Sequence, residues 1–193
     1  MSIPDSKTLR RALEAYPEVV QLQGVNRLPE LDRWYHEDLP GEIHKREPGH
    51  VTHAELVRLS EWKMARGVWR ARNLVLVRSN DVNKVEEISR DALARVPHPT
   101  APVSKLATLK GIGPATASAA VAAAAPETYP FFDELVAAQI PGLGKVAWTM
   151  SYYARYAESL RAAAGELGGE WTPALLERAL WAHVGGKAGV AGD

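Results

Sequence analysis

The segment 106–117 (LATLKGIGPATA) carries residues whose types and spacing suit the binding of a phosphate group. Gly111 and Gly113 permit a tight turn that brings the backbone close to a ligand, and Ile112 between them anchors the turn in the core. Pro114 opens the next helix, where its missing N–H costs nothing. Free amides at a helix start favour an anion, because unpaired donors and the helix dipole both attract negative charge. The residues predicted to contact the phosphate are Gly111, Ile112, Gly113, Ala115 and Thr116.

An ordinary corner between two helices is the alternative for this segment, because a bare Gly-x-Gly pattern also suits a simple turn. The flanking residues favour the phosphate-binding hairpin. Leu106 and Leu109 seat the helix before the turn, and Ala117 is small enough for the two helices to cross closely. We assign the hairpin motif to residues 103–125, and contacts of this kind carry no information about base sequence.

The run LATLKGIGPATASAA resembles the hairpin of the helix-hairpin-helix DNA glycosylase superfamily, which includes proteins similar to endonuclease III and to adenine glycosylases. The strong resemblance covers residues 103–138, and the number and order of the flanking helices also suit the family's helical barrel. The region from Trp62 to Arg70 is faintly similar to uncharacterised members. The resemblance implies double-stranded DNA as the partner, with a monovalent cation held by hairpin carbonyls as the one cofactor to consider.

In this superfamily a catalytic Asp begins the helix after the hairpin, and the segment PFFDE occupies that place here. Asp133 lies 20 residues after Gly113, which matches the family's layout. The loop departs from the commoner Val-Asp-x-His type, so Glu134 is a second candidate for the working carboxylate. On residue type alone, Asp133 is a plain N-cap for a helix that begins at Glu134 or Leu135, and the two roles can coexist.

The resemblance implies a monofunctional DNA glycosylase of base excision repair, which hydrolyses the N-glycosidic bond of a damaged or mispaired base. The nucleotide is rotated out of the duplex into a pocket, and a carboxylate stabilises the positive charge that develops on the sugar. An opposite charge at about 4 Å is worth about 4 kcal/mol at an effective dielectric near 20, or a rate factor of about 10³. The nucleophilic Lys of the lyase branch is replaced here by Ala115.

Two other functions stay open. A noncatalytic module on the same scaffold would recognise DNA structure and recruit other proteins, and its DNA binding would weaken with salt. A helical protein-interaction domain would make the hairpin a coincidence, and it would not bind DNA at low salt.

The region 62–72 interleaves aromatic and cationic side chains. On a helix, Trp62, Arg66 and the pair Trp69/Arg70 share a face, from which they could stack on an extruded base and pair with phosphates. The alternative buries the Trp side chains in the core and leaves Arg and Lys solvated. Lys63 could also act as an amine nucleophile in the site. The candidate pocket and DNA-contact residues are Trp62, Lys63, Arg66, Trp69 and Arg70.

Two other patterns are assigned structural roles. His50-x-x-His53 has near-ligand spacing, but no third ligand is evident, so we predict no metal site. Four aromatic residues at helical spacing are predicted to pack in the core: Trp148, Tyr152, Tyr153 and Tyr156.

Helical periodicity runs through nearly the whole chain. Thr52 and Glu55 form a capping box, and Thr172 caps a last helix with Pro173 in its first turn. We therefore predict an all-α bundle or barrel of about 8–10 helices, forming a single domain over residues 1–193. The other predicted segments are helices at 9–20 after a Ser6 cap, 29–36, 70–78, 82–93 and 145–164, a surface loop at 38–50, a connector at 96–102 and a frayed tail at 185–193.

Composition excludes several classes of site and function. The 193 residues include no Cys, which excludes disulfides, Cys-ligated zinc and an iron–sulfur cluster. The 23 Lys and Arg balance the 23 Asp and Glu, which argues against a polycation that coats nucleic acid but permits a local basic face. The start lacks a signal-peptide pattern, and no apolar run reaches the length of a membrane span. We expect a cytoplasmic protein, associated with the nucleoid if it is bacterial, and the sequence leaves its oligomeric state open.

Overall fold

The computed structural model describes residues 3–191, and every regular element in this range is helical, as predicted. The helices outnumber the expectation because the short helices α3 and α12 occupy segments that were predicted to be irregular. The elements are α1 (Ser6–Leu22), α2 (Leu28–Arg33), the π-helical turn η1 (Trp34–Asp38), α3 (Leu39–His44), α4 (His53–Arg66), α5 (Ala71–Arg78), α6 (Val82–Leu93), α7 (Ala101–Leu106), α8 (Pro114–Ala124), α9 (Glu134–Ala137), α10 (Met150–Leu167), α11 (Pro173–His183) and α12 (Gly186–Ala191).

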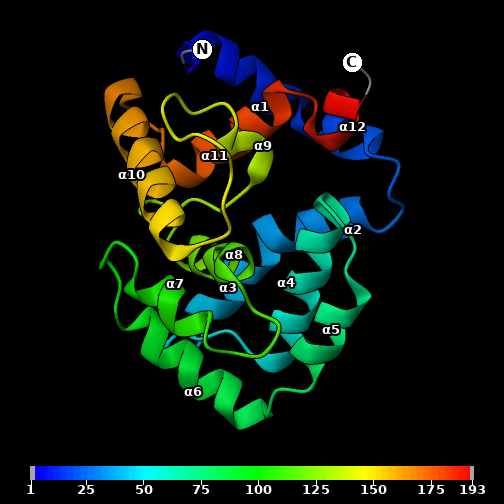
Figure 1. The fold of residues 1–193 in the computed structure, drawn as a ribbon, viewed down its shortest axis with the longest axis vertical. Coiled ribbons are helices and arrows are strands. Elements are labelled where there is room, and N and C mark those ends of the chain that lie inside the picture. The colour runs from blue at the N-terminus through cyan, green and yellow to red at the C-terminus, as the bar shows by residue number, and fades with distance from the viewer. Residues whose placement is uncertain (1–2, 192–193) are drawn as a thin grey trace.

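The helices fall into two groups that join segments far apart in the sequence (Figure 1). One group combines α1 with α9 to α12, and α11 packs against α1, α9, α10 and α12. The other group contains α2 to α8, with α4 packed against α2, α5, α6 and α8. Buried residues of both groups form one continuous hydrophobic core.

Helix α8 lies at the centre of this arrangement (Figure 1). It is mostly alanine, and every residue from 115 to 123 is buried. A helix that is apolar on all sides belongs in a protein interior, and its small side chains let α3, α4 and α7 pack closely around it. Of the helices formed by residues 3–191, none combines the length and hydropathy needed to cross a bilayer.

The predicted helix starts are largely confirmed because capping depends on neighbouring residues. Thr52 and Glu55 form the reciprocal capping box of α4, with hydrogen bonds of 3.3 and 2.9 Å. The Thr172 hydroxyl caps α11. Helix α1 differs by one residue, since the carboxylate of Asp5, rather than Ser6, accepts the backbone hydrogen bond.

The predicted loop at 38–50 is wrong over its first half, where α3 follows η1 directly. Pro40 lies in the first turn of α3, where a proline does not interrupt the helix. Leu39 and Ile43 are four residues apart on this helix, and both are buried in the core. Burial of this apolar pair explains why a segment rich in Pro, Gly and charge is helical.

The predicted helix 145–164 begins later and ends later than expected. Gly142 and Gly144 adopt positive φ values of 77° and 72°, and this backbone conformation keeps the segment just before α10 outside a helix. The Thr149 hydroxyl then caps α10. The helix continues through Gly165, and Gly168 with φ 66° ends it.

The predicted frayed tail at 185–193 is also corrected, because residues 186–191 form helix α12. The side-chain amide of Gln23 donates to the Gly185 carbonyl (3.0 Å) and accepts from the Ala188 amide (3.0 Å). This contact with the end of α1 orders the segment. Residues 192–193 lie outside the described range.

Candidate functional site

The turn between α7 and α8 has the conformation that its glycines predict. Gly111 adopts φ 74°, and a Cβ atom there would lie 2.8 Å from the Asn73 carbonyl oxygen and 2.9 Å from Val77 atoms of α5. Only glycine therefore fits this close approach. Gly113 is the N-cap of α8, and Ile112 between the two glycines is buried in the core, as predicted. The Ile112 amide donates to the Leu109 carbonyl (3.2 Å), which corrects the expectation that this amide contacts the phosphate.

Asn80, just beyond α5, fixes the turn from the other side. Its side-chain oxygen accepts a hydrogen bond from the Lys110 amide, and its side-chain nitrogen donates to the Lys110 carbonyl, both at 2.9 Å. This paired contact resembles the pairing of two strands, so it holds the backbone before Gly111 in one position.

The start of α8 presents backbone donors. Within residues 3–191, the amides of Gly113, Ala115 and Thr116 donate no hydrogen bond to the protein. The first amides of a helix lack partners inside the helix, and here no side chain caps them. Three donors at the positive end of an 11-residue helix are therefore available to an anion.

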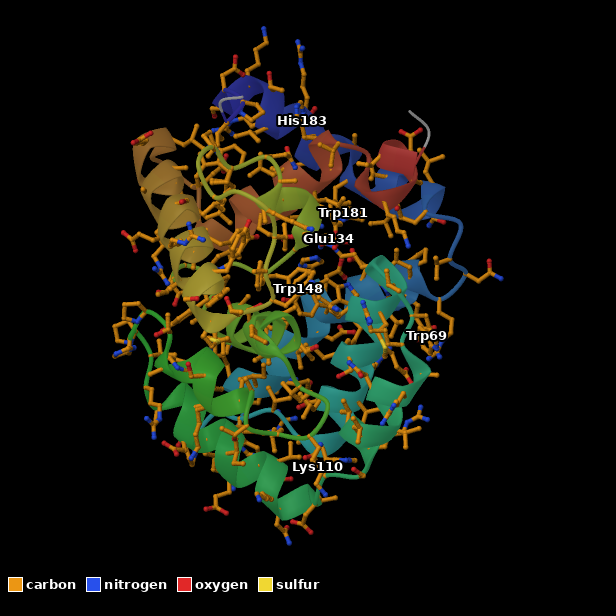
Figure 2. The ribbon with its side chains drawn as sticks, viewed as in Figure 1. Trp69, Lys110, Glu134, Trp148, Trp181 and His183 are labelled. Carbon is orange, nitrogen blue, oxygen red and sulfur yellow. The ribbon has the colours of Figure 1, made fainter. Side chains whose placement is uncertain are left out.

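A pocket of about 290 Å³ lies beside this turn and is also lined by Asp133 and Glu134. Figure 2 shows Glu134 and Trp148 near the centre of the molecule, between the two helix groups, with Trp69 and Lys110 nearer the margin. The lining residues include Lys63, Arg70, Gly111, Gly113, Ala115, Thr116, Phe132, Asp133, Glu134 and Trp148.

Asp133 is both a helix cap and a pocket residue. Its Oδ1 atom accepts hydrogen bonds from the amides of Leu135 (2.8 Å) and Val136 (3.4 Å) at the start of α9. Its Oδ2 atom lies 3.4 Å from the Nε atom of Arg66. Only 9% of the residue is exposed, so the carboxylate has one defined orientation at the pocket wall.

The segment before Asp133 is tied to α8 and α10 by hydrogen bonds. The Phe132 amide donates to the Ser118 hydroxyl (2.9 Å), and Ser118 lies one turn after the amides that face the pocket. The hydroxyls of Tyr153 and Tyr156 donate to the carbonyls of Pro130 (3.3 Å) and Phe131 (2.6 Å). These contacts fix the position of the carboxylate relative to the hairpin turn.

Arg66 does not line the pocket, which corrects the expectation that it contacts DNA. Its guanidinium is buried and forms an ion pair with Glu177 of α11 in addition to its contact with Asp133. One cation thus faces two carboxyl groups. Burial raises the pKa of Glu177 to about 8, although Arg66 opposes this increase.

Trp62 is also a core residue and not a wall of the pocket, so its predicted contact with a base is wrong. Its ring is fully buried, stacks on Tyr35 with 3.7 Å between ring centroids, and donates from Nε1 to the Asp32 carboxylate (2.9 Å). Trp62 and Arg66 share a helix face, as predicted, but that face of α4 points into the protein. The alternative of a buried Trp is confirmed for this residue.

Of the other candidate residues in the 62–72 region, two line the pocket and one lies on the surface. Lys63 and Arg70 line the pocket. Trp69 is 52% exposed and lies outside the pocket lining. Burial and the nearby charge of Arg70 lower the pKa of Lys63.

Trp148 lines the pocket, although its helical spacing predicted a place in the core. It is 44% exposed, and its ring packs on Phe132 with 4.9 Å between centroids. The three tyrosines of the same pattern are buried as predicted. The signal that separates them is the glycine pair before Trp148, because it keeps this residue outside α10.

His50, the first residue of the histidine pair, is held by contacts with its neighbours in the protein. The ring of His50 contacts the Pro48 carbonyl (2.9 Å) and lies 3.7 Å from Glu86. Among residues 3–191, no group of three or more His, Asp or Glu side chains is arranged to hold a metal ion.

Comparison of the chain with protein-family models, curated proteins and solved structures finds no match.

Proposed function

We propose that this protein is a DNA glycosylase that releases a damaged or mispaired base by hydrolysis. One observation carries the proposal: the anion-accepting start of α8 and the Asp133 carboxylate line the same pocket. Base excision needs an anchor for the backbone beside the lesion and a carboxylate at the sugar, and this pocket brings the two together.

In this proposal, the amides of Gly113, Ala115 and Thr116 bind a phosphate next to the extruded nucleotide. The nucleotide enters the pocket against the exposed ring of Trp148, which packs on the buried ring of Phe132. Asp133 then stabilises the positive charge on the deoxyribose and orients the attacking water. Arg66 contacts the opposite side of the carboxylate and keeps it from rotating away.

The hairpin turn has backbone carbonyl oxygens of the kind that bind a monovalent cation. Within residues 3–191, the backbone carbonyls of Thr108 and Gly111 accept no hydrogen bond, and such oxygens are suitable ligands for a hard cation. When bound, the ion would add positive charge beside the phosphate. The step of base release proposed for Asp133 does not pass through it.

The test is a single-turnover assay on duplexes that each carry one alkylated, oxidised, deaminated or mispaired base. The DNA is treated with alkali, which breaks the strand at an abasic site, and the released base is identified by mass spectrometry. Release of a free base from at least one duplex supports the proposal. Binding of these duplexes without release from any of them contradicts it.

A noncatalytic DNA-binding module is the second candidate function. The contacts that Asp133 makes within the protein favour it. One carboxylate oxygen caps α9 and the other faces Arg66, so the residue already has a structural role. This function predicts DNA affinity that falls with salt and with changes at Gly113, and no base release. Fluorescence anisotropy at several salt concentrations, combined with the assay above, separates the two candidates.

A further inference from the structure

Lys63 is a pocket residue to which the proposed hydrolysis gives no role. It lies on α4, its side chain is half-buried, and it lines the pocket together with Asp133 and Glu134. Its Nζ atom lies 5.6 Å from the centre of the Trp148 ring. In the part of the chain that the structure describes, this amine forms neither a hydrogen bond nor an ion pair within the protein. A primary amine without a protein partner therefore lines the pocket that also holds the two carboxyl groups.

The surroundings of Lys63 favour a nucleophilic amine. Desolvation by burial and the charge of Arg70 lower the pKa of Lys63, so a larger fraction of the amine is neutral than for a solvated lysine. Only the neutral amine can attack a carbonyl group. Arg70, the other cation of the pocket, has a guanidinium that stays protonated and cannot take this role.

We propose that Lys63 attacks the C1′ aldehyde of an abasic deoxyribose and cleaves the DNA strand by β-elimination. This activity goes beyond base release and rests on the proposed function only in requiring that DNA occupy the pocket. The amine comes from α4 and not from the hairpin, where the corresponding position is Ala115.

Each step of the proposed reaction balances. The neutral amine adds to the aldehyde of the ring-opened sugar, and uptake of one proton from solvent with loss of one water leaves a protonated imine between Nζ and C1′. A carboxylate of the pocket, Asp133 or Glu134, removes a proton from C2′. The electron pair forms a C2′–C3′ double bond, and the C3′–O bond breaks with the phosphate as leaving group. Water then hydrolyses the imine, which frees Lys63 and an unsaturated aldehyde without any change of oxidation state in the protein.

Borohydride trapping on a duplex with one preformed abasic site tests this inference. Borohydride reduces the imine to a stable amine, so protein and labelled DNA become covalently joined and the adduct migrates slowly in a denaturing gel. We expect an adduct for the wild-type protein, and we expect peptide mapping by mass spectrometry to locate it on Lys63. An adduct on another residue, or no adduct, would overturn the inference.

Variants sharpen the assignment. Lys63→Arg keeps the positive charge but removes the primary amine, so the adduct is expected to fall at least about tenfold, while anisotropy shows DNA binding retained. Lys7→Arg is the matched control, because Lys7 is exposed on α1, away from the hairpin (Figure 1), and its adduct should equal that of the wild type. Adduct formation by Lys63→Arg at the wild-type level contradicts the inference.

The preformed abasic site separates this inference from the proposed function. An adduct on Lys63 without base release from any lesion would support the lyase activity and contradict the glycosylase. Base release without an adduct would support the glycosylase and contradict the lyase activity.

Discussion

The Nε atom of Arg66 lies 3.4 Å from the Oδ2 atom of Asp133, and both side chains are almost completely buried. Because Arg66 also pairs with Glu177 of α11, one guanidinium from α4 joins two carboxyl groups that belong to the other helix group, which contains α9 and α11. The orientation of the candidate catalytic group therefore depends on packing between α4 and α11.

Replacement of Arg66 by Met is expected to destabilise the protein by about 3–5 kcal/mol, since it leaves the buried Asp133 carboxylate without its cation and Glu177 without the guanidinium that donates to it. Urea denaturation measures the change in the free energy of unfolding. Arg70→Met is the control, because Arg70 is exposed and its loss should change stability by less than about 0.5 kcal/mol. Equal stability of the two variants would show that the buried guanidinium contributes nothing.

Glu177 makes the stability dependent on pH. Burial raises its pKa from 4.5 to about 8 in the folded protein, so the folded state holds a proton that the unfolded state has already released at neutral pH. The stability from this group is therefore complete below about pH 4.5 and is lost as the pH rises through about 8. Glu177→Gln stays neutral, so its stability should fall less than that of the wild type, by at least about 1 kcal/mol between pH 5 and 9. Parallel pH profiles from urea denaturation would contradict this.

The two glycines of the hairpin turn should respond differently to alanine. At Gly111 a Cβ meets α5 and the φ value is positive, so Gly111→Ala is expected to cost about 1–3 kcal/mol of stability. At Gly113 a Cβ meets no atom within 4 Å, so Gly113→Ala should leave stability within about 0.5 kcal/mol. The added methyl would crowd the bound phosphate and weaken DNA binding roughly tenfold. Thermal denaturation and anisotropy on both variants check these expectations, and unchanged DNA affinity of Gly113→Ala would count against the phosphate contact.

Trp148 and Trp62 exchange the roles expected from the sequence. Trp148→Ala should weaken DNA binding by about 1–3 kcal/mol if the ring stacks on the extruded base, with little loss of stability because the ring is 44% exposed. Trp62→Ala should cost about 3–5 kcal/mol of stability, since it removes a fully buried side chain. Anisotropy and urea denaturation on the pair test the exchange. DNA affinity unchanged in Trp148→Ala would remove this residue from the site.

Features that depend on neighbours in the sequence were predictable. The capping box at Thr52 and Glu55, the turn at Gly111 and the start of α9 after Asp133 each follow from residue types within a few positions. The pocket wall at Asp133 and Glu134 was reached only through the resemblance, because the residues alone indicate no more than a helix cap.

Features that depend on tertiary packing were not predictable. Amphipathic periodicity shows that Trp62 and Arg66 share a face, but not that a second carboxyl group from α11 would draw the arginine inward. Similarly, the spacing of Trp148 matches the buried tyrosines, and only the backbone at Gly142 and Gly144 separates it from them.

The most direct test compares Asp133→Asn with Glu134→Gln in single-turnover release of a base from the same duplex. Asparagine also caps helices, so Asp133→Asn should fold and bind DNA while it loses the charge. We predict that Asp133→Asn slows base release at least about 10³-fold, while Glu134→Gln slows it much less. Wild-type rates of base release for Asp133→Asn would contradict the catalytic role of this carboxylate.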